Sequence, residues 1–318
     1  MESGGQFKVS FNKDLGGGNS VKLHAKFLDD KTPTLLSTPV NTVNGQIVTL
    51  PGVDPRTFSP YASNLPTISQ FGMHGGAASM NDGLRSKSTA IGSEINLNLG
   101  EGWTLNDKFR FSSSGGTWAG MTTPGTFGTA GSLATEFGGA GATAVFRNGG
   151  ASATNQQAFV GHLFNVSMND LGNTVNDLKA SKSFTTDGAK VSTTVGLFNM
   201  TQAINMDWQW SSYLLSLNGA NPAIIDIMRN GAKINPTGTG FANGADAWGN
   251  CCVTSYNLKY TQTAPNATIA WEKGPINADA GVRLDNINAS GSAPWGGQPV
   301  NYSFTKPSFT AGLRSEER

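Results

Sequence analysis

The feature that most constrains the fold of this chain is an alternation of apolar and polar residues with a period of two. It is clearest in INADAGVRLD, residues 276–285, where every second residue is apolar. Successive side chains of a β-strand point to opposite faces, so such a segment has one apolar and one polar face. The pattern recurs and predicts nine strands, at about 7–11, 21–27, 91–99, 103–111, 178–184, 190–200, 256–271, 276–288 and 300–313.

The composition supports an all-β fold and excludes some functions. Glycine is abundant, at 41 of 318 residues, and charged residues make up only 14%, which favours turns and strands over helices. No run of 18 apolar residues occurs, so no transmembrane helix is predicted. The net charge of +1 argues against a nucleic-acid partner, because such proteins normally carry a basic excess.

The connections between the predicted strands alternate sharply in length. Those at about 14–19, 100–102, 185–188 and 273–275 are tight and rich in Gly, Asp and Asn. The others are mostly long, at about 29–89, 113–173, 201–252 and 289–299. Loops this long are uncommon in a compact soluble sandwich, whereas short turns at one end and long extracellular loops at the other are typical of outer-membrane barrels. We therefore predict an antiparallel transmembrane β-barrel segment.

The two faces of the predicted strands agree with a membrane barrel. The polar face carries full charges such as Lys22, Glu94 and Arg110, which suit a wet lumen, and the apolar face has aromatic residues near strand ends. Asp107 falls on the apolar face, so we expect a local bulge there or a position outside the hydrocarbon. The alternation slips near Pro265 and near Pro307, which predicts a bulge at each.

One long loop contains the best candidates for contact with a ligand. In WQWSSYLLSLNG, residues 208–219, apolar residues lie at helical spacing, and NPAIIDIMRNG follows with helix-start and helix-stop signals, so two short helices are predicted. The aromatic residues Trp208, Trp210 and Tyr213 are the candidate ligand-binding residues. The alternative, which we favour, is that they pack on one another in a loop over the barrel mouth.

The sequence carries no pattern that predicts catalysis, a metal site or a cofactor. The three histidines are far apart and lack partners at ligand spacing, and no nucleophile motif occurs. We therefore predict that the protein is not an enzyme. The adjacent Cys251 and Cys252 can form a vicinal disulfide in an oxidising compartment, and the alternative is two ordinary thiols in a loop.

Several stretches together resemble TonB-dependent outer-membrane receptors of the proteobacterial type. TAPNATIAWEKGPINADAGVRLDN, residues 263–286, resembles a hairpin of that family, with a short turn and a strand that ends in Gly-x-Arg. KPSFTAGLR, residues 306–314, is similar to the strand that follows there. FLDDKTPTLLSTPV, residues 27–40, and LGEGWTLNDKFRFSS, residues 99–113, also resemble barrel segments of the family.

The resemblance implies that residues 1–318 are part of a larger, 22-stranded receptor barrel, with the plug domain absent. It implies residence in the bacterial outer membrane, in contact with its lipid, and uptake of an extracellular small molecule or metal chelate such as a ferric siderophore. The energy would come from the TonB system, reached through the missing N-terminal region. A passive porin-like channel and a secreted β-rich structural or adhesive protein remain as alternatives.

Overall fold

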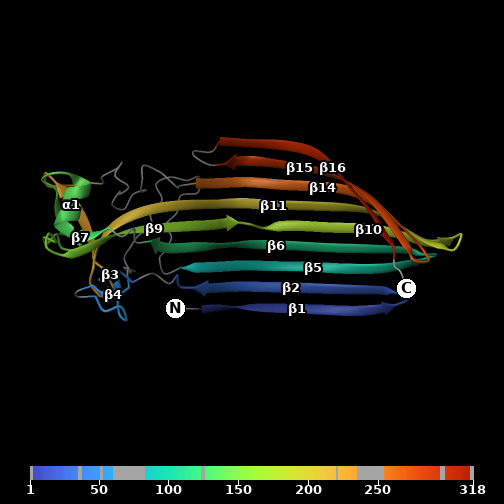
Figure 1. Cartoon of the computed structure of the whole chain (residues 1–318), viewed down its shortest axis with the longest axis horizontal. Helices are drawn as coiled ribbons and strands as arrows, with labels where there is room; N and C mark the ends of the chain where they lie inside the picture. Colours follow the sequence, from blue (N-terminus) through green and yellow to red (C-terminus); the bar gives the residue numbers. More distant parts are fainter. Residues whose placement is uncertain are drawn as a thin grey trace.

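The structure is a computed structural model that describes residues 3–34, 38–50, 53–59, 83–122, 126–219, 221–234, 254–293 and 298–315. It is dominated by one antiparallel sheet, curved like part of a barrel wall, whose strands run side by side along most of the molecule (Figure 1). The predicted all-β antiparallel fold is confirmed. In the described part of the chain, no helix is long and apolar enough to cross a membrane.

Nine strands form the main path of the sheet, and each corresponds to one of the nine predicted strands. Across the sheet, the order of the strands is β1 (Ser3–Gly16), β2 (Asn19–Thr32), β5 (Leu84–Gly100), β6 (Trp103–Thr122), β10 (Asn173–Thr186), β11 (Ala189–Ser216), β14 (Thr254–Lys273), β15 (Ile276–Ala293) and β16 (Gln298–Ser315). Each strand pairs with its neighbours in this order. Most are longer than the sequence predicts, above all β11, which has 28 residues.

The tight turns lie together at one end of the sheet, as predicted, and the described parts of the long connections lie at the other end (Figure 1). The turn between β10 and β11 consists of Asp187 and Gly188, whose φ angles are 50° and 73°. Two successive positive φ angles are the mark of a type I′ hairpin turn, whose twist matches that of the flanking strands. Local turn chemistry therefore fixes this end of the sheet.

Strand β9 (Gln157–Asp170) continues the row of β10 between β6 and β11, in a stretch predicted to be a loop. Met168 pairs with Met206 and Asp170 with Asn205, so Asn169 is an extra residue, a β-bulge. Its amide Nδ2 donates to Asn205 Oδ1 at 3.1 Å and to Asp207 Oδ2 at 2.9 Å. Because of this bulge, even-numbered side chains lie on opposite faces in β9 and β10.

Cross-strand partners share a face, so the register divides the side chains of the sheet into two sets. We call apolar face the side that carries Leu97, Leu105, Val195, Ala267 and Phe309, which follow one another across the sheet. Many large apolar side chains of this face are exposed, among them Phe7, Phe11, Leu23, Phe27, Ile91, Phe111, Val195, Ile269 and Val282. An exposed apolar surface of this extent indicates a face that is covered by lipid or protein.

We call the opposite side the inner face, and it carries the charged residues that the sequence assigns to the polar set. Lys22 Nζ lies 3.6 Å from Glu94 Oε1, and Lys179 Nζ lies 2.7 Å from Asp177 Oδ2. The His24 side chain on this face lies over Gly92, where an added Cβ would come within 2.4 Å of its Nε2. The predicted separation of charged and apolar side chains is thus confirmed.

The bulges predicted near Pro265 and Pro307 do not occur. Leu197 pairs with Pro265 and Leu284 with Pro307, within unbroken registers. The alternation slips because the large apolar residues change from one face of the strand to the other, while the strand itself continues without a break. Beyond these prolines, toward the long connections, the aromatic side chains of β14 and β16 lie on the inner face: Tyr256, Tyr260, Tyr302 and Phe304.

No bulge occurs at Asp107 either. It pairs in register with Ile95 and Leu178, in the middle of the apolar face. The Asn176 side chain on the same face donates from Nδ2 to Asp107 Oδ1 at 2.6 Å. A neighbouring amide rather than a change in the backbone accommodates this carboxylate.

Described parts of the long connections form a unit that we call the head. It combines the far ends of β6, β9 and β11 with β7 (Phe127–Thr129), α1 (Ala130–Gly138), β8 (Thr143–Phe146), β12 (Ile224–Arg229) and β13 (Ala232–Lys233). A separate hairpin consists of β3 (Val40–Val43) and β4 (Gln46–Thr49). The two helices predicted over 208–230 are wrong, since those residues lie mainly in β11, β12 and the hairpin turn Asn230–Gly231.

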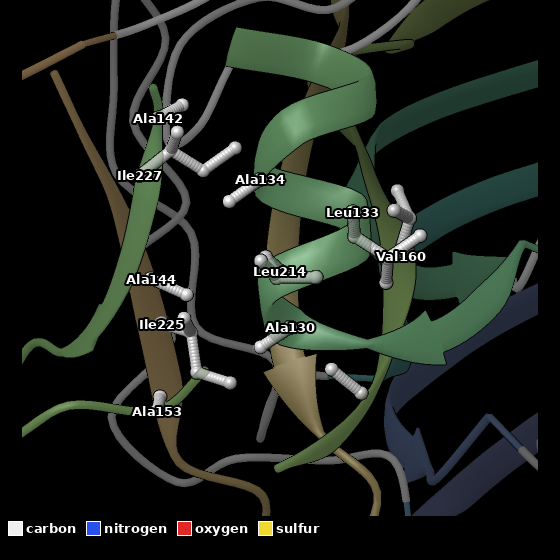
Figure 2. Close-up of a cluster of buried hydrophobic side chains, with 11 residues drawn as sticks. Ala130, Leu133, Ala134, Ala142, Ala144, Ala153, Val160, Leu214, Ile225 and Ile227 are labelled. Atoms are coloured by element: carbon white, nitrogen blue, oxygen red, sulfur yellow. The ribbon is translucent and has the colours of Figure 1, made fainter. Parts of the chain in front are cut away.

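Side chains of the head cover both faces of the far ends of β6, β9 and β11. On the apolar side, Phe159, Leu163 and Tyr213 pack with Val53 from the segment 53–59. On the inner side, α1 packs against β9, β11 and β12, and Figure 2 shows its Leu133 beside Val160. The helix begins at the N-cap Thr129, whose hydroxyl accepts from Ser132 N at 3.2 Å. Strands buried on both faces lose the polar–apolar alternation, which explains why the sequence does not reveal them.

Candidate ligand site at the mouth of the sheet

Three aromatic side chains gather on the inner face where the sheet enters the head. Trp118 of β6 and Trp208 of β11 both pair with Val166 of β9, so they lie in one row. Their ring centroids are 6.5 Å apart, and the Phe164 ring meets Trp118 edge to face at 4.8 Å. We call Trp118, Phe164 and Trp208 the mouth cluster.

A glycine of β6 leaves the space that the Phe164 ring of the mouth cluster occupies. Gly120 pairs with Phe164, and a Cβ added at Gly120 would lie 2.6 Å from Phe164 Cζ. The phenyl ring therefore lies directly over the glycine backbone, and its position against Trp118 depends on the missing side chain. Phe164 is buried, whereas Trp118 is 39% exposed, so the cluster presents an indole ring to its surroundings.

The mouth cluster also offers hydrogen-bonding capacity. Within the part of the chain that the structure describes, the buried Nε1 of Trp208 and the buried Oγ1 of Thr254 have no hydrogen-bond partner. The two residues pair across β11 and β14. A buried N–H without an acceptor costs free energy, so a bound group with an oxygen acceptor would stabilise this site. The arrangement suits a ligand that combines a flat or apolar surface with acceptor oxygens.

The three residues proposed from the sequence do not form one cluster. Trp208 belongs to the mouth cluster, but Tyr213 lies on the other face of β11, fully buried in the head. Burial raises the pKa of Tyr213 to about 12, and the Arg147 guanidinium lies 5.9 Å from its ring centroid. Trp210 lies in β11, but its side chain is outside the described residues. Trp118 lies in the far end of β6, which the sequence predicts to be a loop because the alternation ends near Phe111, and Phe164 was missed because β9 carries no alternation.

A histidine–serine pair lies on the same face, between the mouth cluster and α1. His162 Nδ1 is 2.6 Å from Ser212 Oγ, and the residues are 4% and 0% exposed. Burial lowers the pKa of His162 to about 4, so the ring is neutral at pH 7. Protein covers both residues, and the contact between their side chains joins β9 to β11 within the head.

An ion cluster in the head joins β12 and β13 to the turn that follows β8. Asp226 of β12 accepts from Arg147 Nη2 at 2.6 Å and lies 3.1 Å from Lys233 Nζ. Burial raises the pKa of the Asp226 carboxyl, but the hydrogen bonds from Arg147 and Lys233 outweigh it, so the net pKa is lowered. The cluster is satisfied internally and offers no ligand site.

The other candidate sites do not add to the mouth cluster. Cys251 and Cys252 lie outside the described residues. Among the residues that the structure does describe, no three His, Cys, Asp or Glu side chains are grouped so that they could hold a metal ion. The mouth cluster is therefore the candidate site that the described geometry supports best.

The chain is similar to known proteins only in the comparison of structures, and two of the similar structures are receptors. No family model matches it, and no curated protein matches it. It is similar to the siderophore receptor PiuA from Acinetobacter baumannii, at 12% identity and a TM-score of 0.45, over 100% of this chain and 46% of that one. It is also similar to the ferric-catecholate import receptor Fiu from K12 E. coli, at 10% identity and a TM-score of 0.25, over 98% and 47%. The chain spans less than half the length of either receptor.

Proposed function

We propose that this chain forms part of the barrel wall of an outer-membrane receptor that takes up a scarce nutrient. The observation that carries the proposal is the exposed apolar face, which lies opposite a charged inner face along a long antiparallel sheet. From Trp103 to Phe111 the apolar residues of β6 extend over roughly 26 Å along the strand, close to the height of the apolar band of outer-membrane barrels. On this proposal the apolar face contacts lipid and the inner face lines the lumen.

The ends of the sheet support an orientation. Short turns lie at one end and the folded head at the other, the arrangement of periplasmic turns and extracellular loops. The mouth cluster then lies where an extracellular ligand enters the lumen. Its aromatic rings and the unpaired Trp208 N–H suit a chelate with flat or apolar groups and acceptor oxygens, such as a ferric siderophore.

The resemblance of residues 263–286 and 306–314 to TonB-dependent receptors supports active rather than passive transport. On this proposal, residues 1–318 are a partial receptor barrel, and the plug and the contact with the TonB system belong to a region outside them. The ligand is bound, not chemically changed, so the protein is a transporter and not an enzyme.

The proposal is tested by deletion of the gene in its source bacterium and complementation on a plasmid. Uptake of radiolabelled ferric siderophores should fall in the deletion strain and return with the intact gene. Trp118→Ala combined with Trp208→Ala should fail to restore uptake, whereas Trp103→Ala, at the turn end of the sheet, should restore it. A protonophore should abolish uptake.

Two outcomes would contradict the proposal. Unchanged uptake of every siderophore tested after gene deletion would refute the receptor function. Uptake that persists with the protonophore would point to a passive channel instead.

A further inference from the structure

The apolar face ends toward the head in a row of charged residues. Phe7 and Phe27 pair with each other in one row of the apolar face. The next row on this face, one step closer to the head, contains Asp29 and Lys87, and the row after it contains Lys31 and Arg85. Arg85 donates from Nε and Nη2 to the two carboxylate oxygens of Asp29, each at 3.0 Å. We call Asp29, Lys31, Arg85 and Lys87 the basic rim; its formal charge is +3 − 1 = +2.

Two hollows open on the apolar face at the basic rim. One has a volume of about 530 Å³ and is lined by Ser3, Gly5, Phe7 and Lys31, and the other has about 570 Å³ and is lined by Lys87, Ser113 and Gly115. Both are also lined by Phe27, Asp29 and Arg85, so the ion pair stands between them. Gly5 lies at one end of the Asp29–Lys87 row, and its missing side chain leaves open space, since an added Cβ would meet nothing within 4 Å. Gly115 lies at the other end, where the Met168 carbonyl comes so close that an added Cβ would lie 2.7 Å from its oxygen.

We propose that the basic rim binds a phosphorylated membrane lipid, with the phosphate on Lys31 and Lys87 and an acyl chain along Phe7 and Phe27. The occupant follows from charge and polarity together: positive charge directly above exposed phenyl rings fits an anionic head group on an apolar tail. The inference rests on the proposed membrane position of the apolar face. It adds a lipid site on the outer surface, which is separate from the mouth cluster on the inner face.

The test uses the full chain, folded in dodecyl maltoside micelles, and a dye-labelled bisphosphorylated glucosamine lipid as the probe. Fluorescence anisotropy gives the dissociation constant. Lys31→Gln combined with Lys87→Gln should weaken binding, by about fivefold for each lysine removed. The matched control is Lys8→Gln combined with Lys26→Gln, two lysines that pair with each other on the inner face of β1 and β2, and it should bind as the original chain does.

Further arms identify the source of the phosphate. The dephosphorylated lipid should bind no more tightly to the original chain than to the Lys31/Lys87 variant, and excess inorganic phosphate should not displace the labelled lipid. Equal weakening in both double variants, or full displacement by inorganic phosphate, would overturn the lipid site. If the double variant loses its strand signal in circular dichroism, Lys87→Gln alone should still weaken binding about fivefold, because Lys87 is exposed and its replacement disturbs no packing.

Flotation of the chain with liposomes separates this inference from the proposed function. A chain that floats but does not distinguish the phosphorylated lipid would retain its membrane position and lose the lipid site. A folded chain that does not float would refute the membrane position itself, and the lipid site with it.

Discussion

At the scale of single residues, glycines decide where large side chains of the inner face can lie. The His24 ring lies over Gly92 and the Phe164 ring over Gly120, each too close for an added Cβ. Such pairs cannot be read from the sequence, because a glycine within a strand is equally typical of a turn or a bulge. This is one reason why Phe164 was missed as a site residue while Trp208 was recognised.

We predict that Gly120→Ala disrupts the mouth cluster. The new Cβ would lie 2.6 Å from Phe164 Cζ, so the ring must move away from Trp118. Overpacking of this kind costs about 1–3 kcal/mol. The change should shift tryptophan fluorescence and lower the midpoint of thermal unfolding. Gly5→Ala is the control, since an added Cβ there meets nothing within 4 Å, and an equal effect in both variants would contradict the prediction.

His162 makes the stability of the head depend on pH. Its pKa is about 4 in the folded protein, below the ordinary value of 6.5, because burial disfavours the charged ring. Between these values the unfolded chain binds more protons, so the stability is complete above pH 6.5 and is lost as the pH falls toward 4. The pKa difference corresponds to a loss of up to about 3 kcal/mol.

We therefore expect hydrogen exchange in β9 and β11 to become faster between pH 6.5 and pH 4, after correction for the intrinsic rate. His162→Gln, which keeps a polar group beside Ser212 but does not titrate, should remove most of this dependence. His24→Gln is the control, because His24 lies on the inner face of the open sheet. If the original chain and both variants showed the same pH dependence of exchange, carboxylates rather than His162 would be its cause.

At the scale of elements, the sequence predicts strands reliably where one face is apolar and the other polar. All nine strands of the main path have such a segment, and hairpin chemistry marks the turns between them. The prediction failed in the head, where Ile224, Ile225 and Ile227 of β12 are buried and no alternation remains. The turn Asn230–Gly231, with φ angles of 51° and 77°, is a hairpin signal that was misread as the end of a helix.

We predict that Gly231→Val opens the β12–β13 hairpin. A β-branched residue at a φ of 77° costs about 1–2 kcal/mol, and the hairpin has only two cross-strand pairs to oppose it. Hydrogen exchange should accelerate in β12 and β8 and remain slow in β14 and β15. Gly188→Val, at a φ of 73° in the turn between β10 and β11, should instead affect the opposite end of the sheet. Identical exchange patterns in the two variants would show that the head is not a local unit.

At the scale of the whole molecule, the polarity of the two faces should decide whether the protein inserts into a membrane. Val195 lies on the apolar face and is 59% exposed, and Thr194 beside it lies on the inner face. An arginine at the middle of the lipid-facing band costs about 2–4 kcal/mol. Val195→Arg should therefore lower the yield of chain that floats with liposomes, while Thr194→Arg should not. Equal yields would contradict a lipid-facing role for the apolar face.

The order of the strands has a consequence for how such a sheet can close on itself. Every neighbour along the main path is antiparallel, and the path has nine rows, so β1 and β16 run in the same direction. Among the described residues each of these two strands is paired along one side only, so each can pair with a further strand. Two copies joined edge to edge would meet in parallel. An all-antiparallel ring can be completed only by inserting an odd number of further strands between β16 and β1.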